Sequence, residues 1–203
     1  MKKIIRGCLA LLGVILLANC QQKEPAGSCR IHGTIDNQYN GKLIYLVPIT
    51  NDSPQNVDSA TVKDGHFEFV TDTTMVAKVI MHMRYRFGLQ TLLVVAEPGD
   101  VNVSIDSISH ASGTPQNDSL EMWKGVTEAH NLQMLQLRQA GNQSAADSVH
   151  LAYKHYTRRL AENLKSGVLH DFLKGLYPLT YQKQLPDGRT VTVNADTHEE
   201  VAE

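Results

Sequence analysis

The chain has 203 residues, of which 42% are hydrophobic, and a formal net charge of −2 at pH 7. This length and composition indicate a globular protein with one domain, or two small ones, and enough apolar residues for a sizeable core. The 19 basic residues are outnumbered by 21 acidic ones and form no cluster, which argues against a nucleic-acid-binding surface and against bulk attraction to anionic lipid headgroups.

The N-terminal segment has the pattern of a secretory signal. Two lysines and an arginine near the start precede an apolar run from Cys8 to Ala18. This run is 11 residues long, whereas a membrane-spanning helix needs roughly 20. A basic start, a short apolar stretch and a processing site together predict that the protein is exported.

The signal ends in Leu17-Ala18-Asn19-Cys20, which resembles the lipobox of bacterial lipoproteins, with Asn19 where Gly, Ala or Ser is usual. We therefore predict that residues 1–19 are a lipoprotein signal peptide and that Cys20 carries the lipid that anchors the protein to the membrane. Residues 20–28 are polar and rich in helix breakers, which is typical of a flexible tether. The alternative is an ordinary secretory signal cleaved elsewhere, with Cys20 as an incidental thiol.

Cysteine content limits the redox chemistry. After cleavage and lipidation Cys29 is the one thiol left in the sequence, so an intrachain disulfide is excluded. The sequence has no Cys-x-x-Cys motif, which excludes a thioredoxin-type dithiol mechanism for this chain. Cys29 shares the apolar side of an alternating segment with Ile31 and Ile35, so we expect it to be buried and inert.

Residues 29–113 predict a β-sandwich or open barrel of short antiparallel strands. Asp64-Gly65 is a strong hairpin signal, and Glu97-Pro98-Gly99-Asp100 indicates a second turn. The segments between such turns alternate in polarity or are wholly apolar, as strands do. The expected strands are Cys29–Ile35, Lys42–Val47, Asp58–Val62, His66–Val70, Val76–Arg84, Thr91–Ala96 and Val101–Ile105.

The hydrophobic period changes after this region. Residues 117–177 predict a helical extension, in which a helix from about Asn117 and a second helix that ends at Gly167 are separated by Gly141-Asn142. A third, shorter helix is expected from Val168 until Pro178 stops it. The tail, residues 178–203, has a candidate hairpin around Pro186-Asp187-Gly188. The fold class predicted is α+β.

The first predicted helix, which begins at about Asn117, is apolar on more than one side. Leu132 and Leu135 accompany the stripe that contains Met134 and Leu137. One interpretation is that the additional side packs on the β half or on the third helix. The other is a docking surface for a protein partner or for a second copy of the chain.

Several motifs of the β half occur together in a known family. They are Cys29-x-Ile31-x-Gly33-Thr34-Ile35, Ile44-Tyr45-Leu46, the segment from Asp58 to Phe69 and Glu97-Pro98-Gly99-Asp100-Val101. Over about residues 20–175 the chain resembles the domain of unknown function 4369 of exported bacterial lipoproteins. The resemblance implies a β-rich domain and helical extension that usually precede a thioredoxin-like domain, and it implies no catalytic residues. We expect this chain to lack the thioredoxin-like domain, either as a stand-alone variant or as a truncated relative.

The motifs for common catalytic and metal sites are missing from the sequence. The nine histidines are scattered, and His150 and His155 are five residues apart, whereas helical zinc pairs need three or four. No nucleophile elbow, phosphate loop or His-Glu-x-x-His motif occurs. We therefore expect no metal, no cofactor and no enzymatic activity.

Five Asp-hydroxyl dipeptides, each followed by a small or apolar residue, are similar to the O-glycosylation acceptor pattern of some exported bacterial proteins. The alternative is that these pairs serve in helix caps and turns. The candidate acceptors are Ser59, Thr73, Ser107, Ser119 and Ser148.

These observations predict an outer-membrane lipoprotein of the cell envelope, facing the periplasm or the cell surface and acting as a non-enzymatic binding or interaction module. One alternative is an accessory to a thioredoxin-like thiol redox system in the envelope. Another is a remnant without independent activity. The sequence leaves the ligand or partner open.

Overall fold

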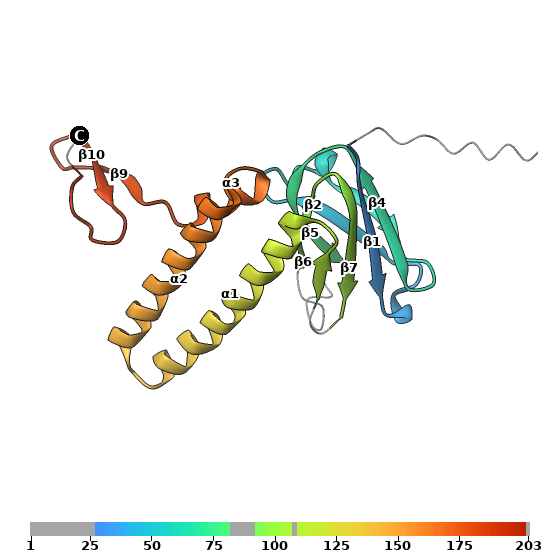
Figure 1. The fold of residues 1–203 in the computed structure, drawn as a ribbon, viewed down its shortest axis with the longest axis horizontal. Helices are drawn as coiled ribbons and strands as arrows, with labels where there is room; N and C mark the ends of the chain where they lie inside the picture. The colour runs from blue at the N-terminus through green and yellow to red at the C-terminus, as the bar shows by residue number, and fades with distance from the viewer. Residues whose placement is uncertain (1–26, 82–91, 107–108, 202–203) are drawn as a thin grey trace, which may run out of the picture.

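A β-sandwich, two long helices, a short third helix and a separate C-terminal hairpin follow one another along the chain (Figure 1). The computed structural model describes residues 27–81, 92–106 and 109–201. The predicted signal peptide, the lipidation site Cys20 and the candidate acceptor Ser107 lie outside this range. The α+β class is confirmed, and the sheets form an open sandwich and not a closed barrel.

Two four-stranded sheets make up the sandwich. Their strand orders are β4-β1-β7-β8 and β3-β2-β5-β6. Short 3-10 turns follow β1 and β2, at Asn37–Tyr39 and Pro54–Asn56. The strands are β1 (Cys29–Ile35), β2 (Leu43–Pro48), β3 (Asp58–Thr61), β4 (His66–Thr71), β5 (Met75–Met81), β6 (Leu92–Ala96), β7 (Gly99–Ile105) and β8 (His110–Ser112).

One strand pair differs from the antiparallel expectation. β1 and β7 run parallel, with Ile31 opposite Val101, whereas the other pairs between the described strands of the sandwich are antiparallel. The chain forms the whole second sheet between these two strands, so β7 returns to the first sheet in the direction of β1. A parallel pair needs such a long connection.

The core of the sandwich follows the alternation of its strands. In β1 the side chains of Cys29, Ile31 and Ile35 are buried, and Gly33 leaves room for a neighbour. A Cβ atom on Gly33 would lie 1.9 Å from the ring of Phe67, the residue opposite it on β4. Cys29 is 2% exposed, which confirms its predicted burial.

The predicted Asp64-Gly65 hairpin turn is also confirmed. Both residues have a positive φ, of 50° and 72°, as a type I′ turn requires. The turn is closed by hydrogen bonds between Lys63 and His66 in both directions, at 2.8 and 2.9 Å.

A second core lies between the helices and the outer side of β5 and β6. It includes Val76 and Val95 from the strands and Leu120, Trp123 and Leu169 from the helices. The apolar run of β6 follows from this arrangement, since one side of the strand faces the other sheet and the opposite side faces the helices. The helices are α1 (Pro115–Gln139), α2 (Gln143–Leu164) and α3 (Val168–Leu176).

The start of α1 lies earlier than the sequence indicates, at Pro115 and not at about Asn117. Proline suits the first helical position because its φ is preset and no N–H is needed there. Asn117 is fully buried. Its side chain accepts a hydrogen bond from the Val95 N–H at 2.9 Å and donates to the Val95 carbonyl at 2.7 Å and to Thr114 Oγ1 at 2.8 Å. The amide thereby extends the ladder at the edge strand β6.

The C-terminal segment forms a hairpin of β9 (Thr180–Gln184) and β10 (Thr190–Asn194), separate from the sandwich. All five side chains of β9 are exposed. Figure 1 shows the hairpin beside α2, on the side away from the sandwich.

We predict that Asn117→Ala lowers the free energy of unfolding by about 3 kcal/mol, because it leaves the buried N–H and C=O of Val95 without partners. Urea denaturation followed by circular dichroism measures this change. Asn131→Ala, on the exposed side of the same helix, is the control, with an expected change within about 0.5 kcal/mol. Equal losses in the two variants would contradict the role given to Asn117.

Candidate functional site

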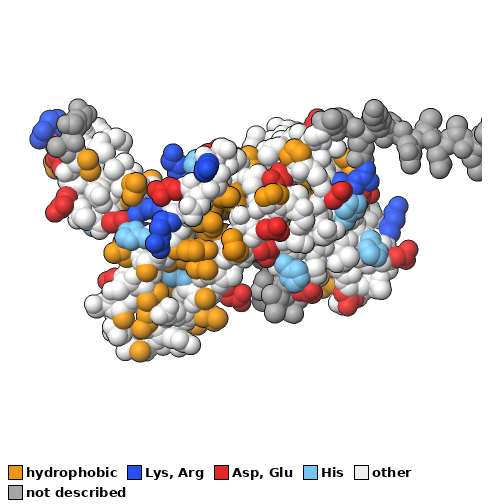
Figure 2. All heavy atoms as spheres, in the orientation of Figure 1, with side chains coloured by type: hydrophobic (Ala, Val, Ile, Leu, Met, Phe, Trp, Pro, Cys, Tyr) orange, Lys and Arg blue, Asp and Glu red, His pale blue; other side chains and the backbone are white. Residues whose placement is uncertain are grey.

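Large hydrophobic side chains are exposed along the outside of α1. Met122, Leu132 and Leu135 keep 60%, 57% and 53% of their surface exposed. Trp123 and Met134 of the same helix are buried on its other side. Figure 2 shows hydrophobic side chains gathered over the two long helices. The residues of this exposed surface, which we call the α1 outer face, are Met122, Gly125, Val126, Ala129, Leu132 and Leu135.

The sandwich holds the N-terminal end of α1 firmly. Glu97, which follows β6, accepts hydrogen bonds from the backbone N–H and the side-chain amide of Gln116, both at 2.8 Å. The side-chain oxygen Oε1 of Gln116 in turn accepts a hydrogen bond from the backbone N–H of Leu169 at 3.0 Å, at the start of α3. One side chain therefore joins the sandwich, α1 and α3, and the far half of α1 extends away from this junction (Figure 1).

Aromatic rings fill the space between α1 and α2. His130 stacks on Tyr153 with ring centroids 4.1 Å apart, and its Nε2 lies 3.4 Å from Nδ1 of His150. Tyr177, which follows α3, meets Tyr153 and His150 edge-on. The Tyr153 hydroxyl is 2.7 Å from Thr127 Oγ1 on α1. These contacts keep the two helices in register.

The surroundings of His150 in this cluster favour its neutral form. Burial lowers the pKa of His150, and His130, Lys154 and Arg138 lower it further because each places positive charge nearby when it is protonated. A hydrogen bond between the two rings requires one nitrogen to donate and the other to accept, which two protonated rings cannot provide.

A single carboxylate ties the C-terminal hairpin to α2. Asp196 accepts hydrogen bonds from Arg158, from Lys154 at 2.6 Å and from His155 at 3.2 Å. The Arg158 guanidinium beside Asp196, followed by Lys154, holds the pKa of that carboxyl far below its usual range. The carboxylate therefore stays ionised in the folded chain below about pH 4, the region where an aspartate of the unfolded chain takes up a proton. The stability that the ion pairs with Arg158 and Lys154 contribute is complete above about pH 4 and declines as the pH falls below it.

Arg158 also supports the chain after α3. The residue is 8% exposed, and its side chain donates to the carbonyls of Tyr177 and Pro178 at 2.8 and 3.1 Å. A buried guanidinium needs such partners because each unpaired N–H would cost free energy. Arg158 and Asp196 are thus joined mainly for structural reasons.

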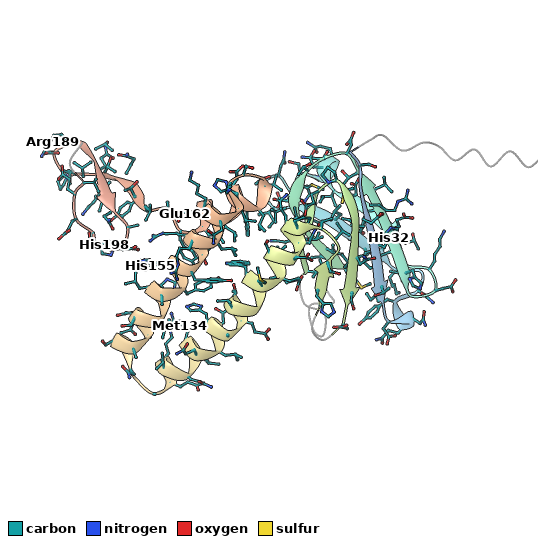
Figure 3. The ribbon with its side chains drawn as sticks, in the orientation of Figure 1. His32, Met134, His155, Glu162, Arg189 and His198 are labelled. Atoms are coloured by element: carbon teal, nitrogen blue, oxygen red, sulfur yellow. The ribbon has the colours of Figure 1, made fainter. Side chains whose placement is uncertain are left out.

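Polar side chains cover the outer side of the first sheet, and cross-strand pairs satisfy several of them. Arg30 donates to Glu68 at 2.8 Å, and His32 Nε2 lies 3.3 Å from Asp100. An open groove of about 750 Å³ crosses this side, with His32, His66 and His110 in its lining. Figure 3 shows His32 on the sandwich and His155 on α2, far from each other, so these two histidines do not converge.

The described residues contain no group of three or more His, Cys, Asp or Glu side chains placed to hold a metal ion. Cys29 is a free, buried cysteine, and burial raises the pKa of its thiol, which disfavours the reactive thiolate. Within the described part of the chain, no helix is long and apolar enough to cross a membrane.

The candidate O-glycosylation acceptors do not converge either. Ser59 lies exposed on β3 and Thr73 lies exposed between β4 and β5. Ser119 is half-buried on α1, where its hydroxyl donates to the Pro115 carbonyl, and the hydroxyl of exposed Ser148 donates to the Ser144 carbonyl on α2. The two helical serines therefore make the local hydrogen bonds that such residues make in helices.

Two clusters escaped the sequence analysis. The His130–His150 pair joins residues of different helices, and the spacing rule for helical zinc pairs compares residues of one helix. Asp196 lies in a stretch that resembles a frayed tail. His150, Tyr153 and Tyr156 recur every three residues on one helix, and this spacing is the signal that could have indicated an aromatic interior.

We predict that the free energy of unfolding falls as the pH drops below about 6.5, the ordinary pKa of histidine. Because folding lowers the pKa of His150, the unfolded chain binds more protons than the folded chain as the pH falls below this value. The part of the stability that is linked to His150 is therefore complete above the ordinary pKa of histidine and is lost as the pH falls below it. Urea denaturation at pH 7.5 and pH 5 measures the fall. The fall should be smaller in His150→Gln and unchanged in His110→Gln, an exposed control on β8. The same fall in His150→Gln as in the parent chain would contradict this assignment.

Comparison with known proteins shows which family the β-sandwich resembles. Residues 29–120 match the model described as Domain of unknown function (DUF4369). No curated protein and no solved structure matches the chain. The matched segment contains the whole sandwich and the first turns of α1, so it ends before the α1 outer face begins. The β-sandwich of this chain is a domain of the DUF4369 family.

Proposed function

We propose that this protein is an exported lipoprotein of the outer membrane, anchored through lipid such as palmitate at Cys20, that binds a protein partner through the α1 outer face without catalysing a reaction. The exposure of Met122, Leu132 and Leu135 on one helix carries the proposal. Contiguous exposed apolar side chains mark interaction surfaces, because isolated ones are common but a row of them is costly in water.

The way the helices are held supports this function. Glu97, Gln116 and Asn117 fix the start of α1 on the sandwich, and the aromatic cluster fixes α1 against α2. The apolar side chains therefore lie on a helix whose backbone is already ordered. A preordered surface binds with a smaller loss of conformational entropy than a flexible one.

An accessory role in thiol redox chemistry is the second candidate, and the location of Cys29 limits its form. Because Cys29 is buried with a raised pKa, this chain would contribute binding and its partner the reactive thiols. The α1 outer face would be the binding surface for either function, and the identity of the partner decides between the two functions.

Membrane anchoring is tested by Cys20→Ser. We expect the parent chain in the membrane fraction of its native cells and the variant released from it, because the sandwich and helices carry no excess of basic residues to hold lipid headgroups. Cys29→Ser is the control, since a buried thiol cannot accept lipid. Membrane association that survives Cys20→Ser would overturn the lipid anchor.

Partner binding is tested with a photoreactive amino acid placed at position 132. Illumination of native cells should cross-link the chain to a specific protein from position 132 but not from Val70, an equally exposed residue on β4. Mass spectrometry of the cross-linked band identifies the partner. A thioredoxin-like protein would favour the accessory role, and the absence of any band specific to position 132 would overturn the proposed function.

A further inference from the structure

We infer that His130 and His150 form a binding site for a divalent transition-metal ion, such as Zn²⁺, that joins α1 to α2. His130 belongs to α1 and His150 to α2. Three features support this site: the separation of two ring nitrogens, the contacts that hold both rings, and the charges around them. The site is distinct from the α1 outer face and does not depend on the proposed function.

The distance between the facing nitrogens is that of two ligands on one zinc ion. Nε2 of His130 and Nδ1 of His150 are 3.4 Å apart. Two nitrogens bound tetrahedrally to zinc, each about 2.0–2.1 Å from the metal, are about 3.3–3.4 Å from each other. The ring centroids are 5.5 Å apart, so these nitrogens lie on the edges of the rings that face each other. A zinc ion beside the line between them therefore reaches both without a change in their separation.

A hydrogen bond at the other nitrogen of His130 prepares that ring to bind a metal. Nδ1 of His130 lies 3.3 Å from Oδ1 of Asn131, and this oxygen can only accept. Nδ1 therefore carries the hydrogen, and Nε2 presents its lone pair to His150. Metal-binding histidines commonly have their tautomer fixed in this way. When the metal binds, the hydrogen on Nδ1 of His150 moves to Nε2 of the same ring, so that ring stays neutral and its Nδ1 becomes a ligand.

Aromatic contacts hold both rings in place before a metal binds. His130 stacks on Tyr153 with the ring planes 14° apart, and the Tyr153 hydroxyl is 2.7 Å from Thr127 Oγ1. Tyr177 meets the ring of His150 edge-on, with centroids 5.9 Å apart. Both histidines are half-buried, so solvent reaches them. Ligands that packing has already ordered lose little conformational entropy when they bind.

The charges around the pair permit a cation. Burial lowers the pKa of His150, so its lone pair is available near neutral pH, as metal binding requires. The ammonium of Lys154 donates to Asp196 at 2.6 Å, which offsets its charge. Asp147, three residues before His150 on α2, acts on that ring in the opposite sense to Arg138. The two nearby cations are thus each opposed by a carboxylate.

Two protein ligands leave the other coordination positions of the metal to water. Among the residues that the structure describes, no group of three or more His, Cys, Asp or Glu side chains is placed to hold a metal ion. Imidazole nitrogens suit Zn²⁺, Cu²⁺ and Ni²⁺, whereas Mg²⁺ and Ca²⁺ prefer oxygen ligands. We therefore expect reversible binding of a transition-metal ion, with a dissociation constant in the micromolar range and no binding of Mg²⁺.

Isothermal titration calorimetry with ZnCl₂ tests the site in the full chain, purified without a histidine tag and freed of metal with a chelator. The parent chain should bind one Zn²⁺ ion and should show no heat of binding with Mg²⁺. His130→Gln and His150→Gln should each weaken Zn²⁺ binding at least tenfold, because a single imidazole remains. His155→Gln, at an exposed histidine of α2, should keep the parent affinity.

Two calorimetric results would overturn the site. One is a parent chain that binds no Zn²⁺ up to about 1 mM. The other is Zn²⁺ binding that is as tight in both His130→Gln and His150→Gln as in the parent chain, because the ion would then be held by other residues.

A spectroscopic measurement on the parent chain keeps the site testable if a variant folds poorly. Pulsed electron paramagnetic resonance of the chain with one equivalent of Cu²⁺ should show coupling to two imidazole rings, since Cu²⁺ accepts the same nitrogen ligands. His155→Gln should give the same spectrum. Coupling to one imidazole, or to none, would contradict a site made by His130 and His150.

Discussion

The structure depends on the side chain of Asn117, which pairs with both backbone groups of Val95 at the edge of the second sheet. An edge strand presents unpaired N–H and C=O groups, and this amide satisfies one pair of them inside a dry interface. It also fixes the point where α1 leaves the sandwich. Because α2 and α3 pack on α1 and on β5 and β6, the location of the whole helical extension follows from that contact.

The sequence predicts the elements of this fold better than their pairing. Alternation located β1, and the Asp64-Gly65 dipeptide located the hairpin turn, since both signals are local properties of a few residues. The parallel pairing of β1 with β7 depends on how the chain returns after a whole sheet, and no local pattern contains that information. Asn117 illustrates the same limit. As a polar residue near a helix start it is typical of a cap, whereas its partners are on a strand.

The candidate site was predictable in part. Leu132 and Leu135 already make the first helix too apolar for a single buried stripe, and the structure shows both exposed. The pairs His130–His150 and Arg158–Asp196 were not predictable, because they join residues from separate elements. The family match ends at residue 120, and the α1 outer face lies beyond it.

The place of β1 in its sheet has a mechanical consequence. β1 lies between β4 and β7 and is hydrogen-bonded to both along its length. A force applied at Cys29, the end nearest the predicted tether, is directed along the strand and across these hydrogen bonds. Extraction of β1 would have to shear two ladders at once instead of opening one bond at a time. A domain attached through this end is thus loaded in the direction in which its sheet resists most.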